Sequence, residues 1–174
     1  EYVAAWTNRL FLLTHQPDVP AERVYAEHVR FGEMMDRQAR EHRLPHANGR
    51  DPERPLRVGF VSGDLRAHPV AHFIEPVWAS LDRNAFRLHA YSNHREEDHT
   101  SGRLRALCDA WTSVHADKDE ALAGRIRADS IDILFDLSGH TAFNRLGVFA
   151  LRPAPVQVTW IGYPNTTGLP SQHS

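Results

Sequence analysis

Short apolar runs alternate with segments of helical periodicity from residue 56 onward, and this alternation restricts the possible folds more than any other feature of the sequence. Such runs are typical of strands buried on both faces of a parallel sheet, with helices as the crossover connections. Strands are expected near Leu56–Ser62, Phe86–Ser92, Trp111–His115, Ile131–Leu137 and Val156–Ile161. Helices are expected near Val70–Leu81, Thr100–Asp109, Lys118–Ala128 and Asn144–Ala150. Because right-handed crossovers bring all strand carboxyl ends to one edge of the sheet, ligands are expected to bind at that edge.

The amino-terminal part of the chain has a purely helical pattern. Residues 1–13 show helical spacing, and a proline-bounded turn separates them from a second helical segment over Ala21–Leu44. One face of that second segment carries the apolar stripe Val24, His28, Phe31 and Met35. Because His28 belongs to this stripe, we expect it to be a packing histidine and not a ligand.

The stretch Pro45–Pro55 is rich in Asn, Gly, Asp and Pro and is predicted to be a linker. It divides the chain into a helical connector, residues 1–48, and an α/β lobe, residues 55–174. A chain of 174 residues is long enough for one such core with a short helical extension. Helical spacing begins at the first residues and Glu1 is not an initiator methionine, so we expect the chain to be part of a longer protein.

Charge and cysteine content exclude several classes of protein. The net charge of -2 argues against a broad phosphate-binding surface, so nucleic acid is not an expected partner. Cys108 is the single cysteine, which rules out an intrachain disulfide and fits a reducing compartment. No apolar run approaches the roughly 20 residues that cross a bilayer, and no signal sequence is evident. We therefore expect a cytoplasmic protein without a membrane partner.

Polar side chains follow the first expected strand. Asp64 and His68 lie on the loop after Ser62, and Pro69 suits the first position of the helix that comes next. The amides of Val70 and Ala71 would then be free to face an anion. The alternative is that Asp64 only organises the turn.

The same loop lacks the signatures of other nucleotide sites. It has neither the three-glycine dinucleotide fingerprint nor a glycine-rich turn that ends in Gly-Lys-Ser or Gly-Lys-Thr. His68 and His72 stand four residues apart, which raises the possibility of zinc. No glutamate follows the first histidine as in a zincin, and the chain has 12 histidines, so we expect no metal.

Two further strand ends carry polar or glycine-rich loops. The fourth strand runs into residues 136–141, which include His140, and the fifth runs into residues 160–168. Gly162 and Gly168 bracket a loop whose backbone could approach a ligand closely. Trp160 or Tyr163 could stack on a sugar or a base, although structural packing also explains each aromatic residue singly. Because the loops after the first, fourth and fifth expected strands are all polar or glycine-rich, a binding site at this edge is favoured over simple turns.

Four stretches, residues 56–64, 68–73, 127–141 and 152–164, together resemble the catalytic region of the O-GlcNAc transferase and SPINDLY family. The resemblance covers about residues 56–169. Residues 8–11 and 27–28 are similar to the helical connector that follows the tetratricopeptide (TPR) array in bacterial members.

This resemblance implies a GT-B glycosyltransferase, in which two Rossmann-like lobes clasp a nucleotide sugar and transfer the sugar to serine or threonine hydroxyls with inversion. The chain would supply the amino-terminal lobe, with UDP-GlcNAc as donor, a protein as acceptor, and no metal or cofactor. Asp64 and His68 match the family's active-site aspartate and histidine, of which either could accept the proton of the attacking hydroxyl. The positions that match donor-binding segments are Pro69, Val70, His140, Ile161, Gly162, Tyr163 and Pro164.

The sequence departs from the family in two respects. The lysine and glutamine that hold the diphosphate and uracil belong to the family's second lobe, and residues 171–174 do not resemble the family's continuation. Three alternatives therefore stay open. They are O-fucosyl transfer within the same family, a noncatalytic protein-interaction fragment, and a free-standing Rossmann-like nucleotide-binding enzyme.

Overall fold

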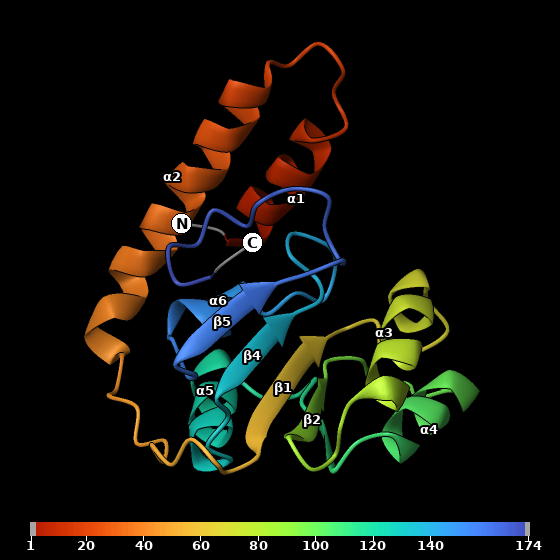
Figure 1. Ribbon diagram of the computed structural model, residues 1–174. Helices are drawn as coiled ribbons and strands as arrows, with labels where there is room; N and C mark the ends of the chain where they lie inside the picture. Colours follow the sequence, from red (N-terminus) through yellow and green to blue (C-terminus); the bar gives the residue numbers. More distant parts are fainter. Residues whose placement is uncertain (1–2, 173–174) are drawn as a thin grey trace.

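Five strands form one all-parallel sheet in the order β3-β2-β1-β4-β5 (Figure 1). The computed structural model describes residues 3–172. The strands are β1 (Leu56–Ser62), β2 (Phe86–Ser92), β3 (Ala110–Ser113), β4 (Ile133–Asp136) and β5 (Val156–Thr159). The helices of the lobe are α3 (Pro69–Ser80), α4 (His99–Ala106), α5 (Asp119–Ala128) and α6 (Leu146–Ala150). The predicted parallel α/β architecture is confirmed.

The last two strands are shorter than predicted because the backbone turns sharply at their ends. Ser130, three residues before β4, has a φ of 53°, and Ile161, two residues after β5, also has a φ of 53°. A positive φ is incompatible with an extended strand. Extended pairing therefore stops at Thr159, two residues before the predicted end.

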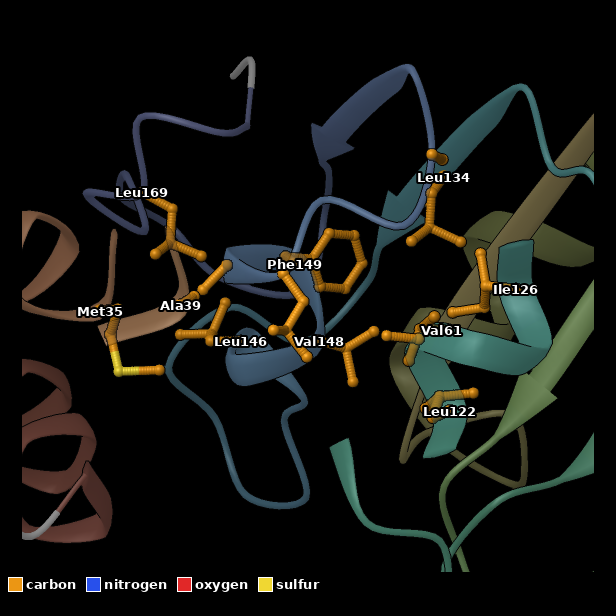
Figure 2. Close-up of a cluster of buried hydrophobic side chains, with 14 of the residues drawn as sticks. Met35, Ala39, Val61, Leu122, Ile126, Leu134, Leu146, Val148, Phe149 and Leu169 are labelled. Atoms are coloured by element: carbon orange, nitrogen blue, oxygen red, sulfur yellow. The ribbon is translucent and has the colours of Figure 1, made fainter. Parts of the chain in front are cut away.

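The two faces of the sheet are covered unequally. Helices α3 and α4 pack on one face over Phe60 and Leu88, through a cluster that includes Ile74, Trp78 and Leu104. The other face is covered by α5 and α6 and also by the amino-terminal helices α1 (Val3–Leu13) and α2 (Ala21–Ala39). Figure 2 shows α6 between α2 and the sheet. Leu146 and Phe149 of α6 lie between Met35 of α2 and Leu134 of the sheet.

The connector helices share this core and do not form a core of their own. Val24, His28, Phe31 and Met35 are buried, as predicted. The predicted helix over Ala21–Leu44 instead ends as a short 3-10 turn over Arg40–His42. The chain becomes extended at Arg43, whose guanidinium donates to the Ala150 carbonyl of α6 (2.9 Å, Nε to O). This tertiary bond holds the chain against α6 just after the helix ends.

Helix α2 and the loop after β5 are in backbone contact. A Cβ atom on Gly32 would lie 1.7 Å from the Gly168 carbonyl oxygen. Gly168 has a φ of 77°, and a Cβ there would lie 1.9 Å from the His28 carbonyl oxygen. Only glycine allows this approach on either side, so two glycines bring the connector onto the carboxyl edge of the sheet.

One buried carboxylate holds the linker to the opposite edge. Asp132 accepts hydrogen bonds from Asn48 (2.7 Å), from the Arg54 guanidinium (2.6 and 2.7 Å) and from the Arg57 amide (2.9 Å). Burial alone would raise the pKa of Asp132, but these hydrogen bonds outweigh it and hold the pKa below its usual value. The predicted linker is therefore held to the lobe by Asp132, together with hydrogen bonds from His46 and Asn48 to main-chain carbonyls of the lobe.

Part of the sheet stays open on the α3 side. Phe60, Ile133, Phe135, Val158 and Trp160 line an apolar groove of about 380 Å³ there. Trp160 lies with its ring edge toward Phe135, at 6.3 Å between ring centroids. None of the helices among residues 3–172 has the length and apolar character needed to span a membrane.

The contact between Gly32 and Gly168 can be tested by adding one methyl group. We expect Gly32→Ala to lower the free energy of unfolding by about 2 kcal/mol or more, because the new Cβ meets main-chain atoms that cannot rotate away. The control is Gly124→Ala in α5, where a Cβ meets nothing within 4 Å. That change should raise the free energy of unfolding by about 0.5–1 kcal/mol, since alanine favours the helix. Urea denaturation measures both values, and equal effects would show that the backbones are not in contact.

Candidate functional site

Asp64 lies on the loop after β1, at the carboxyl edge of the sheet. Its residue is only 6% exposed. The turn is held by Ser62, whose Oγ accepts the Asp64 amide at 2.9 Å. Within residues 3–172, the Asp64 carboxylate accepts no backbone hydrogen bond and has two longer contacts, 3.7 Å to Arg66 and 3.8 Å to His68 Nε2. The carboxylate therefore does not organise the turn and is available for chemistry.

His68 caps helix α3. Its backbone is extended, and its Nδ1 accepts the Val70 amide at 3.3 Å. The Ala71 amide donates to the His68 carbonyl at 3.0 Å. The prediction that the Val70 and Ala71 amides are free to face an anion is therefore wrong, because the residue before the helix already satisfies both.

This cap also fixes the tautomer of His68. A neutral imidazole that accepts at Nδ1 carries its proton on Nε2, which we assign from the hydrogen bond. The Nε2 proton then faces the Asp64 carboxylate. In this tautomer Nε2 has no free lone pair, so His68 can take a proton from a hydroxyl only at Nδ1, after it releases the cap. The Asp64 carboxylate, 3.8 Å from Nε2, would then stabilise the imidazolium.

The loop after β4 is organised by a residue that sequence reasoning did not single out as functional. The Asp136 carboxylate accepts the amides of Ser138 (3.0 Å) and Gly139 (3.1 Å) and the Thr159 hydroxyl (3.2 Å). Burial raises the pKa of Asp136, and these hydrogen bonds oppose that rise. An aspartate two residues before Ser-Gly is a turn signal that could have identified it.

A buried cluster of aromatic rings lies beside these loops. Tyr163, 9% exposed, donates its hydroxyl to His28 Nε2 at 2.8 Å, while His28 Nδ1 donates to the Val24 carbonyl at 2.7 Å. His140 is 2% exposed and donates from Nε2 to the Thr167 carbonyl at 2.9 Å. The expected packing role of His28 is confirmed. The idea that Tyr163 stacks on a ligand is wrong, because its ring is enclosed and its hydroxyl is bonded.

The loop after β5 approaches the protein itself. A Cβ on Gly162 would lie 1.8 Å from the Leu137 carbonyl oxygen, and one on Gly168 would meet α2. The predicted close approach of these glycines is therefore to the chain's own backbone. Pro164 is exposed, whereas Ile161 and Gly162 are partly exposed. Trp160 lies over the open sheet face beside Phe135, away from the edge loops.

The structure brings some of the predicted site residues together and separates others. Asp64 and His68 form one pair, and the exposed Pro69 follows directly. In the described part of the chain, no hydrogen bond or ion pair joins residues 63–70 to residues 161–164. His140 and Tyr163 act as supports behind the β5 loop. Their direct contact with a donor stays a prediction.

Within residues 3–172, neither the cysteine nor a metal centre offers an alternative site. Cys108 lies two residues beyond α4, and burial raises the pKa of its thiol to about 12, so it is inert at neutral pH. Among residues 3–172 there is no group of three His, Cys, Asp or Glu side chains placed to hold a metal ion.

The sheet and its edge loops define a Rossmann-like lobe of the GT-B type. A mutant of the Thermobaculum terrenum O-GlcNAc transferase superposes on 99% of this chain with a TM-score of 0.90 and 39% sequence identity. Residues 23–172 match the family model of glycosyl transferase family 41. The chain belongs to glycosyl transferase family 41.

Curated plant relatives agree with this assignment. The chain is 37% identical over 171 residues to a probable UDP-N-acetylglucosamine–peptide N-acetylglucosaminyltransferase SPINDLY of Solanum lycopersicum, and 44% identical over 128 residues to that of Arabidopsis thaliana. These matches cover 96% and 71% of this chain but only 18% and 14% of the relatives. The chain also spans only 33% of the Thermobaculum terrenum chain.

Because His140 is buried in its neutral form, the stability of the fold is expected to depend on pH. Burial lowers the pKa of His140 from 6.5 to about 4. The unfolded chain therefore protonates His140 more readily than the folded chain does. The contribution of His140 to the free energy of unfolding is complete above about pH 6.5. It falls by roughly 3 kcal/mol as the pH drops toward 4. We expect His140→Phe to make the free energy of unfolding less dependent on pH between about 7 and 4.5.

The control for this experiment is His42→Ala, which changes an exposed histidine of the 3-10 turn. It should leave the pH dependence as in the parent chain. Urea unfolding at several pH values measures both variants, and an unchanged slope in His140→Phe would show that His140 titrates normally in the folded state.

Proposed function

We propose that the chain is the amino-terminal lobe of the catalytic region of a protein O-glycosyltransferase. In this proposal the enzyme moves N-acetylglucosamine from UDP-GlcNAc to serine or threonine hydroxyls with inversion at the anomeric carbon. The observation that carries the proposal is the pair Asp64 and His68, 3.8 Å apart at the carboxyl end of β1, in a chain that matches the family over residues 23–172. The similarity to the SPINDLY relatives, described as probable UDP-N-acetylglucosamine–peptide N-acetylglucosaminyltransferases, and to the Thermobaculum terrenum O-GlcNAc transferase supports the proposed donor and reaction class.

The carboxyl end of β1 is the right place for such chemistry. The chain leaves β1 toward α3 and leaves β4 toward α6, and these helices lie on opposite faces of the sheet. Ligands of open parallel sheets bind where the connections diverge in this way. Asp64 and His68 border that point.

The proposed reaction is a displacement at the anomeric carbon. The acceptor hydroxyl attacks, the bond to the nucleoside diphosphate breaks, and the hydroxyl proton passes to His68 Nδ1, which releases the Val70 amide to accept it. The Asp64 carboxylate stabilises the resulting imidazolium. A positioned proton acceptor of this kind contributes roughly 10²–10⁴-fold to the rate. The exposed Pro69 and Pro164 and the partly exposed Gly162 are the donor contacts of the proposal, and it includes no metal or cofactor.

His140 and Tyr163 also support the loop that contacts the donor in this proposal. Tyr163 is bonded to His28 of α2, and His140 to the Thr167 carbonyl, so together they fix the β5 loop on the connector. A second lobe and an upstream TPR array are part of the proposed whole enzyme, which we expect in the cytoplasm.

The 174-residue chain by itself is expected to be inactive. Transition-state stabilisation needs contacts to the departing diphosphate, and in the proposed enzyme these come from the second lobe. We expect no turnover with UDP-GlcNAc or GDP-fucose in a radiolabelled-sugar assay, and no calorimetric signal for UDP at micromolar concentrations. Steady turnover, or a micromolar dissociation constant for UDP, would contradict the two-lobe proposal.

His68 is best tested in a complete catalytic region. We use a chimera in which this chain replaces the matching third of the Thermobaculum terrenum enzyme. His68→Asn removes the imidazole but keeps a good helix cap, whereas His68→Ala removes both. We expect both variants to lose about 10²–10⁴-fold in kcat with little change in donor affinity, and only the alanine variant to lose stability, by about 1 kcal/mol.

The comparison separates catalysis from capping. Steady-state kinetics, donor binding and melting temperature are measured on one preparation of each variant. If His68→Asn keeps the kcat of the parent, His68 is only a cap and Asp64, acting through water, is the remaining candidate for the base. Activity with GDP-fucose in place of UDP-GlcNAc would reassign the donor.

A further inference from the structure

Arg66 lies on the loop after β1, between the two residues of the candidate catalytic pair. Its Nη2 is 3.7 Å from Asp64 Oδ1, and His68 Nε2 is 3.8 Å from the same oxygen. One carboxylate oxygen thus faces a permanent cation and also an imidazole that becomes a cation when it accepts a proton. The charge of Arg66 therefore acts on both members of the pair.

The backbone of this loop is held without the Arg66 side chain. The Leu65 carbonyl accepts the Ser101 hydroxyl at 2.8 Å, and the Asp98 carboxylate accepts the Ala67 amide at 2.7 Å. Both partners lie at the amino terminus of α4. The Nε of Arg66 is buried and has no hydrogen-bond partner among residues 3–172. Because a buried donor without an acceptor costs free energy, hydrogen bonding does not explain this arginine.

The Asp64 carboxylate is well placed to feel the charge of Arg66. Its side chain is only 9% exposed, so water screens the neighbouring charges poorly. In the described part of the chain, its ion-pair contacts within 4 Å are those to Arg66 and His68. The titratable groups around the pair on α3, α4 and the β4 loop have other surroundings: His72 is exposed, Glu75 and His99 contact Arg103, Asp98 and Asp136 accept backbone amides, and His140 is buried against Thr167.

Arg66 opposes the uptake of a proton by the pair before the reaction. The pair is negatively charged when Asp64 is ionised and His68 is neutral, and it is uncharged after either side chain takes up a proton. A neighbouring positive charge favours the first state over the second, whichever side chain takes the proton. Only the first state combines a neutral imidazole, which can accept the hydroxyl proton, with a carboxylate that stabilises the imidazolium. Arg66 thus extends this state toward lower pH.

We propose that Arg66 is a positioning residue that keeps Asp64 ionised and His68 neutral before the reaction, and that it thereby sets the acid limit of the pH range in which the enzyme works. This inference rests on the proposed function, because the reacting pair comes from it. Arg66 acts through its charge and needs no contact with either substrate. The proton still passes from the acceptor hydroxyl to His68 Nδ1.

The kinetic test separates the charge of Arg66 from its shape. Arg66→Gln removes the charge, and Arg66→Lys keeps it. In the chimera we expect Arg66→Gln to move the acid limb of the kcat profile to higher pH by about one unit, because the pair then binds a proton more readily. On the acid limb this is a loss of roughly tenfold in kcat, whereas the plateau at higher pH and both KM values should stay within about twofold. Arg66→Lys should keep the acid limb of the parent.

The matched control is Arg103→Gln, which removes an equal charge from the exposed ion pair with Glu75. It should leave the kcat profile unchanged. An acid limb that is the same in Arg66→Gln and in the parent would overturn the inference. A lower kcat at every pH in both Arg66 variants would show a structural role. A rise in the donor KM of Arg66→Gln, without a shift of the acid limb, would assign the guanidinium to the diphosphate of the donor. Either of these results would also overturn the inference.

A second measurement does not depend on turnover. In the 174-residue chain, nuclear magnetic resonance follows the imidazole Cε1 protons through a pH titration, and the His68 signal is the one that disappears in His68→Asn. We expect its titration midpoint to rise by about one pH unit in Arg66→Gln and to stay near that of the parent in Arg66→Lys. An unchanged midpoint in Arg66→Gln would overturn the inference. Because an inactive parent chimera would count against the proposed function alone, the two failures are distinguishable.

Discussion

The architecture of the carboxyl edge depends on a contact between two backbones. Gly32 of α2 and Gly168 of the loop after β5 approach so closely that neither position has room for a Cβ atom. This contact places the His28 side chain where its Nε2 accepts the Tyr163 hydroxyl at 2.8 Å. The connector is therefore part of the scaffold that holds the β5 loop, and a movement of α2 would be transmitted to that loop through main-chain atoms.

At each of the two strand-end edges of the sheet, a buried carboxylate orders the adjoining segment through hydrogen bonds. Asp132 orders the linker at one edge, and Asp136 orders the β4 loop at the other. Hydrogen bonds lower the pKa of the first below its usual value, whereas complete burial raises that of the second. In both cases the carboxylate oxygens are occupied by hydrogen bonds that hold the fold. Asp64, whose contacts are longer than 3.5 Å, is not engaged in this way.

The candidate site has two sides that meet at the loop after β1. Supports for the β5 loop come from the connector, while the loop after β4 is held at the Phe143 carbonyl by Asn93 at the end of β2. The chain corresponds to 33% of the Thermobaculum terrenum O-GlcNAc transferase, in which the other two thirds complete the polypeptide.

The sequence by itself determined the class of the sheet, the five strands and the buried stripe of α2, because these follow from local periodicity. It also placed Asp64 and His68 at the correct edge, since strand direction decides that. Only the tertiary structure decided that Tyr163 is enclosed and that its hydroxyl is bonded to His28. The physical reason is distance along the chain: His28 and Tyr163 are 135 residues apart, and no local pattern encodes the partner of a buried hydroxyl. The same reason applies to the loop after β4, since the Phe143 carbonyl is held by Asn93, which is 50 residues away.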